Sequence, residues 1–327
     1  MGYGKADIHR EKLILLHSKI SFFHDEVDWM EEWVMEEKLL MIDGFNLLSR
    51  CYFATSYGKE MHQLTRNSQG QFINGLRATF QKLLQLNRLH QPTHLLIAWD
   101  VKRNETIRKE TFQEYKGTRN ELPEPLIQQY ETAVAFFEQI GLAQYTIPRY
   151  EADDILGTFA QKWREEKTGK CIIYSNDRDL LQLLCPQTSQ LIATKQGELN
   201  YSLAHFQQEY GIDPSQWVDV KALLGDKSDN IPGVAGVGEK AALPLVQQYG
   251  GIEQIYDELP TLDDRYKRYI NKLQAGKEMA FLSKELCTII TDVPTIKEQT
   301  WDACCLQIER NTLVQALASL EIAIKIS

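Results

Sequence analysis

Three short apolar runs, each followed within two residues by an aspartate, limit most strongly how this chain can fold. They cover residues 38–42, 94–99 and 170–175. Apolar segments of this length that end at turn residues are typical of fully buried strands. Helical periodicity lies between them, at 126–140 and 155–164. Strands that alternate with helices predict an α/β fold, with a central, mostly parallel sheet and helices on both faces.

The aspartates after these runs are Asp43, Asp100 and Asp177, with Asp179 two residues further on. One aspartate at a strand end is ordinary turn chemistry. Parallel sheets, however, bind their ligands at the carboxyl ends of the strands. Because three strands each deliver an aspartate to that edge, the sequence predicts a single acidic crevice there.

A further group of acids, Glu151, Asp153 and Asp154, starts one of the helical patterns. At helical spacing Glu151 and Asp154 share a face, and Asp153 lies beside them. Like charges about 5 Å apart repel by roughly 3 kcal/mol per pair at an effective dielectric constant near 20. The simpler interpretation is that the helix dipole stabilises one or two acids in its first turn. The other acids expected at the same edge favour a functional cluster.

Basic and aromatic residues occupy the segment 101–122, which follows the second predicted strand. If this segment is helical, Lys116 and Arg119 lie on one face, with Tyr115 beside them and Lys109 two turns earlier. A solvated, charged helix is the ordinary explanation of such a pattern. Because the segment starts at the mouth of the predicted crevice, we interpret it instead as an arch that grips phosphates.

A glycine-rich turn at 233–238 separates two predicted helices near the middle of the second half. Gly236 and Gly238 would let the backbone approach a ligand closely, and free amide groups at the following helix start suit a phosphate. Such a turn is weak evidence by itself. The same block also carries Asp226 and Asp229, and that combination is more specific.

The predicted crevice gathers many negative charges, which require compensating cations. Its carboxylates are Asp43, Asp100, Glu151, Asp153, Asp154, Asp177, Asp179, Asp226 and Asp229. Oxygen ligands without histidine or cysteine select Mg²⁺ or Mn²⁺. The set is large enough for two or more ions, an arrangement used for in-line displacement at phosphorus. Lys116 and Arg119 could then help to hold the phosphodiester.

Composition limits the protein's surroundings. The 327 residues include no apolar run near the roughly 18 residues of a membrane span. The start has no signal-peptide pattern, and the six cysteines show no C-x-x-C spacing, so we expect reduced thiols in a cytoplasmic protein without membrane contact. A net charge of −9 argues weakly against a nucleic-acid partner, unless bound ions neutralise the acids locally.

The ends of the chain are the least informative parts. Residues 1–34 are either an amphipathic extension docked on the body or, as we slightly favour, a leader upstream of a start at Met35. Residues 301–327 predict one further helix. We divide the chain into an extension of unknown role (1–34), an α/β core (35–210) with its arch (101–122), a C-terminal helical region (211–295) and a helical tail (296–327).

The order of these motifs resembles the flap endonuclease / 5′–3′ exonuclease family, most closely the 5′-nuclease domain that precedes DNA polymerase I in bacteria. The resemblance covers roughly residues 38–295. The matching segments are Ile42-Asp43-Gly44, Ala98-Trp99-Asp100, Ile107-Arg108, Tyr115-Lys116-x-x-Arg119, Glu151-Ala152-Asp153-Asp154, Asp177-x-Asp179, Gly225-Asp226-x-Ser228-Asp229-Asn230-Ile231-Pro232-Gly233-Val234 and Gly236-Val237-Gly238-Glu239-Lys240.

The resemblance implies a two-metal nuclease mechanism, with the Glu/Asp-rich group at 151–154 at the catalytic ion. A second metal group would comprise Asp177, Asp179, Asp226 and Asp229. Catalytic roles fall on Arg108, Tyr115, Lys116 and Arg119. The glycine-rich turn corresponds to the family's helix–hairpin–helix motif, which binds duplex phosphates and usually holds a K⁺ ion. The implied DNA-binding residues are Lys109, Ser228, Ile231, Gly233, Gly236, Gly238 and Lys240.

Family substrates are DNAs with 5′ flaps, nicks or RNA-primed 5′ ends, as they arise in primer removal and repair. We expect a stand-alone, monomeric and active enzyme in the bacterial cytoplasm, associated with the nucleoid. One alternative is a ribonuclease of a related metal-dependent class, which would not need the helix–hairpin–helix block. The other is a junction-binding protein without catalysis, which would not need the complete carboxylate set.

Overall fold

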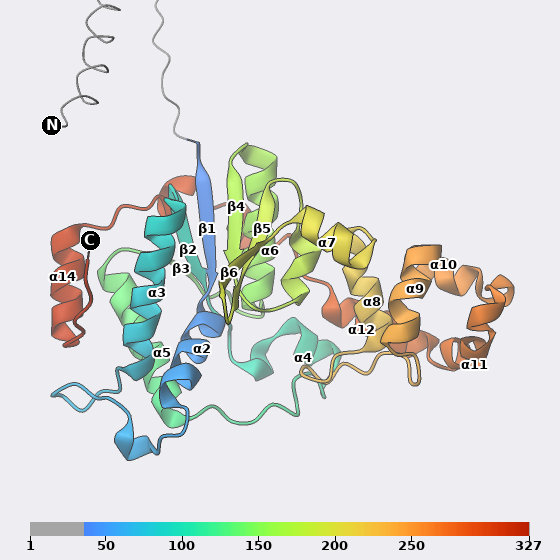
Figure 1. Cartoon of the computed structure of the whole chain (residues 1–327), viewed down its shortest axis with the longest axis horizontal. Helices are drawn as coiled ribbons and strands as arrows, with labels where there is room; N and C mark the ends of the chain where they lie inside the picture. Colours follow the sequence, from blue (N-terminus) through green and yellow to red (C-terminus); the bar gives the residue numbers. More distant parts are fainter. Residues whose placement is uncertain (1–35, 327) are drawn as a thin grey trace, which may run out of the picture. The chain divides into compact units, whose positions relative to one another are not determined.

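The computed structural model describes residues 36–326, so the alternatives for residues 1–34 lie outside the described part of the chain. Within that part, six strands form one sheet in the order β3-β2-β1-β4-β5-β6. Only β6 runs antiparallel, against β5, and the other neighbouring strands are parallel. Helices flank the sheet on both faces (Figure 1). The predicted α/β class is confirmed.

The elements have the following bounds. The strands are β1 (Lys38–Asp43), β2 (His94–Ala98), β3 (Ala143–Tyr145), β4 (Lys170–Tyr174), β5 (Thr188–Thr194) and β6 (Gly197–Tyr201). The helices are α2 (Gly44–Ser56), α3 (Asn74–His90), α4 (Ile107–Thr111), α5 (Glu124–Gln139), α6 (Ala152–Glu166), α7 (Leu203–Tyr210), α8 (Trp217–Leu224), α9 (Glu239–Tyr249), α10 (Ile252–Asp257), α11 (Lys267–Ala275), α12 (Lys277–Cys287), α13 (Pro294–Lys297) and α14 (Arg310–Ser319).

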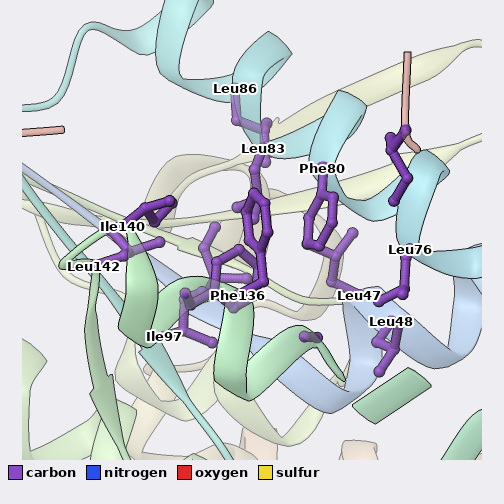
Figure 2. Close-up of a cluster of buried hydrophobic side chains, with 14 of the residues drawn as sticks. Leu47, Leu48, Leu76, Phe80, Leu83, Leu86, Ile97, Phe136, Ile140 and Leu142 are labelled. Carbon is purple, nitrogen blue, oxygen red and sulfur yellow. The ribbon is translucent and has the colours of Figure 1, made fainter. Parts of the chain in front are cut away.

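The sheet has two apolar cores because successive strand residues point to opposite faces. Leu40 and Ile42 of β1 pack in the core formed with α2, α3, α5 and α14, whereas Leu39 packs in the core formed with α6 and α13. Figure 2 shows part of the first core. There Phe80 of α3 stacks on Phe136 of α5, with 3.9 Å between the ring centroids. Burial of the strands on both faces explains their unbroken apolar sequence.

The C-terminal helices have a core of their own, which includes Leu223 of α8, Leu245 of α9 and Leu273 of α11. In Figure 1 these helices extend to one side of the sheet. A small cluster, in which Tyr115 packs with Ile231, connects the segment after α4 to this region. No helix in the described residues is long and apolar enough to cross a membrane.

The strand patterns at β1, β2 and β4 predict those elements correctly, but the sequence does not indicate β3, β5 or β6. β3 has only three half-buried residues. β5 places the polar residues Thr188 and Gln190 at fully buried positions, which hides its apolar signal. β6 is a largely exposed edge strand. A search for apolar runs therefore detects neither short edge strands nor strands that contain buried polar residues.

Two helix predictions are wrong. The tail forms a 3₁₀ turn at Trp301–Cys304 and the separate helix α14, not one continuous helix. In the predicted arch only α4 is an α-helix. Lys116 has a φ of 52°, in the left-handed region, and therefore cannot continue a helix. Lys116 and Arg119 are carried by a turn and do not share a helical face.

The first prediction concerns the core in Figure 2. Leu86 of α3 is fully buried, so Leu86→Ala should lower the free energy of unfolding by about 2–5 kcal/mol through lost burial and the cavity left behind. Leu89, one turn later, is 58% exposed, and Leu89→Ala should change stability by less than about 0.5 kcal/mol. Urea denaturation of both variants measures the difference, and equal effects would contradict this description of α3.

Candidate active site

The aspartates after β1 and β2 are fixed by hydrogen bonds at the carboxyl edge of the sheet. Asp43 caps the start of α2, where one carboxylate oxygen accepts from the Asn46 amide at 3.1 Å. Its other oxygen accepts from the Ser175 hydroxyl at 2.8 Å. Asp100 accepts from the Ala152 amide at 2.9 Å, which connects the end of β2 to the start of α6. Neighbouring parallel strands thus bring these acids together with the acids of α6.

Desolvation and, after it, mutual repulsion raise the pKa values of this group. Burial, followed by the charges of Asp100 and Asp177, raises the pKa of Asp43 to about 7. Burial also raises the pKa of Asp153 well above its ordinary value, and Asp177, Asp43 and Asp100 add to the effect. Burial raises the pKa of Asp100 too, but the nearby Lys116 ammonium opposes this. The predicted convergence of strand-end and helix-start carboxylates is therefore present.

Asp154 is bound to Arg108 in a buried ion pair. Both guanidinium NH₂ groups donate to the Asp154 oxygens at 2.7 Å, and those oxygens also accept from the amides of Ile290 at 2.9 Å and Glu151 at 3.0 Å. Arg108 further donates to the carbonyl oxygens of Leu286 at 2.9 Å and of Thr288 at 2.8 Å. With all their polar atoms engaged, Asp154 and Arg108 connect segments of the fold, and this geometry does not support their predicted roles in metal binding and catalysis.

A second acidic group lies where the loop after β4 meets the turn after α8. Burial and Asp177 raise the pKa of Asp179 to about 6, although the Lys221 ammonium opposes them. Lys221 lies 2.7 Å from Asp179 and also forms an ion pair with Asp226. Burial alone would raise the pKa of Asp226, but hydrogen bonds from Lys221 and Ser228 lower it to about 2.

Sequence reasoning missed Lys221 at this position. The sequence feature that could have indicated this residue is a single lysine in the mostly apolar helix at 217–224, five residues before Asp226. A cation there partly neutralises the second acidic group.

The turn after α4 directs its polar groups toward Glu151 and Asp229. The Lys116 ammonium lies 2.8 Å from Glu151 and 3.8 Å from Asp229, and only 12% of its side chain is exposed. Burial disfavours its charge, but Glu151 and Asp229 raise its pKa. The buried Tyr115 hydroxyl donates to Glu151 at 3.0 Å, and Arg119 forms an ion pair with Asp229. Lys116 is therefore no solvated surface residue.

Lys109, for which a DNA-binding role is predicted, contacts the backbone of its own segment. Its ammonium donates to the carbonyl oxygen of Tyr115 at 3.1 Å and also contacts that of Gln113. In this conformation Lys109 stabilises the turn that carries Lys116.

The glycine-rich block contains a tight crossing of the backbone. Gly233 has a φ of 62°, and a Cβ atom there would lie 2.2 Å from the Gly225 nitrogen, so only glycine fits. Gly236 is also left-handed, with a φ of 79°, whereas Gly238 is extended and has open space around it. Backbone strain therefore does not explain Gly238, and close approach of a ligand remains the prediction.

Two predicted DNA-binding residues of this block are buried. Ile231 is 5% exposed and packs against Tyr115, and its backbone exchanges hydrogen bonds with Asp226. The Gly233 amide donates to the Ser283 hydroxyl at 2.9 Å. The Ile231 side chain and the Gly233 amide group are thus not available to DNA. Lys240, at the start of α9, is exposed.

The carboxylates fit hard divalent ions by their chemistry, since all their donor atoms are oxygens. Among the described residues, however, no three His, Cys, Asp or Glu side chains are already arranged to enclose one ion. Their mutual electrostatic effects indicate that they are neighbours at this edge of the sheet, where a bound ion would draw them together.

The second prediction uses the raised pKa of Asp43. The unfolded chain releases this proton near 3.8 and the folded protein near 7, so stability in metal-free buffer should fall as pH rises through that interval. Asp43→Asn keeps the helix cap but cannot ionise, and should reduce the loss between pH 5 and pH 8 by about 1–3 kcal/mol. Urea denaturation at both pH values measures this. Exposed Glu131→Gln is the control and should retain the parent's pH dependence, whereas an unchanged loss in Asp43→Asn would contradict the assignment.

Comparisons with known proteins agree with this architecture. The family model described as "5'-3' exonuclease, N-terminal resolvase-like domain" matches residues 38–211, and the model described as "5'-3' exonuclease, C-terminal SAM fold" matches residues 212–310. The chain is 55% identical, over 289 residues, to a 5′–3′ exonuclease of Halalkalibacterium halodurans. The aligned residues make up 88% of this chain and 95% of that protein.

The chain is also similar to longer proteins and to solved structures. It is 36% identical to DNA polymerase I of Bacillus subtilis over 262 residues, which is 79% of this chain but only 28% of that protein. A flap endonuclease of bacteriophage T5, in a pseudo-enzyme–product complex with DNA and metal ions, has the same fold, with a TM-score of 0.63 at 22% identity over 87% of this chain and 100% of that one. The two family models and the Halalkalibacterium relative place the chain in the 5′–3′ exonuclease family, whose members are phosphodiester hydrolases.

Proposed function

We propose that this protein is a structure-specific 5′–3′ exonuclease and 5′-flap endonuclease that hydrolyses phosphodiesters with two or more Mg²⁺ or Mn²⁺ ions. One observation carries the proposal. The pKa values of Asp43, Asp100 and Asp153 are raised first by desolvation and then by neighbouring carboxylates, among them Asp177, and the Lys116 ammonium opposes the shift at Asp100 and Asp153. A fold keeps such an arrangement only if a cation offsets the repulsion.

The ions would have two groups of ligands. One ion, near the end of β1, would be held by Asp43, Asp100, Glu151 and Asp153. A second ion would be held by Asp177, Asp179, Asp226 and Asp229. Divalent ions supply Lewis acidity at the phosphate oxygens and acidify the attacking water. Lys221 already contacts two members of the second group, so it would tune how strongly that group binds a cation. The complex of the T5 relative with DNA and metal ions supports a metal-dependent reaction.

Lys116 and its neighbours would position the scissile phosphate. The Lys116 ammonium is turned into the crevice, where Glu151 and Asp229 hold it. Negative charge that develops on a phosphate in the transition state would attract this ammonium. Its contact with the phosphate would then replace its contact with Glu151. Tyr115 keeps Glu151 oriented through its hydroxyl group. Arg119, at the crevice rim, supplies a second positive charge beside Asp229.

The glycine-rich turn would bind duplex DNA through phosphates, independent of base sequence. Gly236 and Gly238 give the backbone room, and Ser228 and Lys240 supply exposed polar groups around it. We retain a K⁺ ion at this turn as part of the proposal. The proposed substrates are DNAs with 5′ flaps, nicks or RNA-primed ends, met in primer removal and repair by a monomer in the bacterial cytoplasm. The DNA complex of the T5 relative and the similarity to DNA polymerase I support this substrate class.

The third prediction tests the activity itself. The protein should cut a labelled 5′-flap oligonucleotide in Mg²⁺ or Mn²⁺ but not in EDTA, because the acidic crevice needs cations before it can approach a phosphate. Asp153→Asn should lower the single-turnover rate by at least about 100-fold with duplex binding retained. Asp302→Asn, at an exposed acid, is the control. Cleavage in EDTA would contradict the metal mechanism, and binding without any cleavage would favour a junction-binding protein.

The fourth prediction separates catalysis from DNA capture. Lys116→Ala should lower the rate at saturating enzyme by about 10²–10³-fold, because this charge acts where negative charge develops in the transition state. Lys240→Ala should weaken duplex binding and reduce its salt dependence, yet leave the saturated rate near that of the parent. Single-turnover cleavage over a range of enzyme concentrations measures both quantities. If Lys116→Ala lost only affinity, Lys116 would be a binding contact.

A further inference from the structure

The loop that carries Asp177 and Asp179 is attached to the neighbouring strand β5. Asn176 exchanges two hydrogen bonds with the backbone of Ala193, its amide NH₂ donating at 2.9 Å and its oxygen accepting at 3.0 Å. The Ser175 hydroxyl accepts from the Asp177 amide at 3.0 Å while it donates to Asp43. This loop is therefore a fixed part of the site, whose backbone is specified by side chains around it.

Gln190 of β5 contacts the backbone of Asp177, while the Asp177 carboxylate itself accepts from the Asp179 amide at 2.9 Å. Its side-chain NH₂ group donates to the carbonyl oxygens of Ser175 at 2.9 Å and of Asp177 at 2.6 Å. The residue is completely buried. Exchange of the amide oxygen and nitrogen would place an oxygen against two carbonyl oxygens, so these contacts fix the orientation of the amide. One side chain thus bridges the two carbonyls on either side of Asn176.

This arrangement has a free-energy penalty that packing alone would not require. The Gln190 amide oxygen is buried and has no hydrogen-bond partner among the described residues. A buried polar atom without a partner destabilises a fold, and an apolar side chain of similar size would avoid that penalty. The two donated hydrogen bonds are what an apolar residue could not provide, and both end on the loop that delivers Asp177.

We propose that Gln190 is a positioning residue for Asp177: it orients the loop so that this carboxylate can bind a divalent ion. The inference rests on the proposed function, because that proposal assigns Asp177 to the metal site. Groups that orient a metal ligand typically change metal affinity by about 10–100-fold when they are removed. Gln190 touches neither the substrate nor the reacting atoms, so its effect should appear first in metal binding.

The alternative is that Gln190 only stabilises the fold, and a second buried glutamine provides the matched control. Gln129 of α5 is also completely buried, and its amide group bonds the backbone of Gly75, Leu76 and Pro125. None of these contacts involves a crevice carboxylate. Gln190→Met and Gln129→Met therefore both remove a buried amide of the same size, but only the first one touches the Asp177 loop.

The test is direct Mn²⁺ binding to the DNA-free protein, measured by titration calorimetry and by the electron paramagnetic resonance signal of free Mn²⁺. Gln190→Met should weaken Mn²⁺ binding about 10–100-fold, and Gln129→Met should bind Mn²⁺ like the parent although its urea midpoint also falls. If Gln190→Met does not fold, Gln190→Glu serves instead, because an ionised oxygen facing two carbonyl oxygens also displaces the loop.

The possible outcomes distinguish this inference from the proposed function. Equal Mn²⁺ affinity in the parent and in the Gln190 variant would overturn the positioning role. A similar loss of affinity in Gln129→Met would also overturn it, since general destabilisation would then explain the effect. A parent that binds Mn²⁺ but does not cut flap DNA would refute the proposed activity and leave the role of Gln190 standing. A parent that binds no Mn²⁺ would refute both.

Discussion

Repulsion between neighbouring carboxylates at the sheet edge is the constraint to which the rest of this structure responds. The parallel sheet brings Asp43, Asp100 and Asp177 to one edge, and the start of α6 adds Asp153. Burial there makes each added negative charge more costly, as the raised pKa of Asp43 shows. Cationic side chains offset part of this repulsion from outside the sheet, Lys116 at the first acidic group and Lys221 at the second. These two lysines thus partly replace the metal ions that the carboxylates are proposed to bind.

The same charges join the catalytic core to the C-terminal helices. Asp229 follows α8, yet its backbone carbonyl accepts from the Lys116 amide at 2.7 Å, and its side chain pairs with Arg119. Arg108 connects Asp154 at the start of α6 to the backbone after α12. The glycine-rich turn and the acidic crevice are therefore attached to one another through the turn after α4. In the proposed function, a duplex bound at the glycine-rich turn would have its 5′ end oriented toward these carboxylates.

Local patterns predict those parts of the molecule that local forces determine. β1, β2 and β4 are buried on both faces, so their apolar runs identify them, and the acids that follow identify the site. The left-handed backbone at Lys116 and the pairing of Arg108 with Asp154, 46 residues away, depend on contacts between distant segments. A sequence pattern shows that these residues are charged but not which partner neutralises them. For the same reason Asp154 resembles a metal ligand in the sequence, whereas in the structure it forms a buried ion pair.

The protein's acidity also has a local explanation. The chain has 45 acidic and 36 basic residues, so the excess of nine acids equals the number of carboxylates predicted for the crevice, Asp154 included. Four cations, Arg108, Lys116, Arg119 and Lys221, pair with members of that set, so the rest of the chain has 36 acids and 32 bases and keeps a formal charge of −4. Divalent ions in the crevice would reduce its negative charge further, and the exposed lysines near the glycine-rich turn would then dominate the field that a phosphate backbone meets. A net charge of −9 is thus compatible with a DNA-binding protein, because about half of it lies where cations are expected to bind.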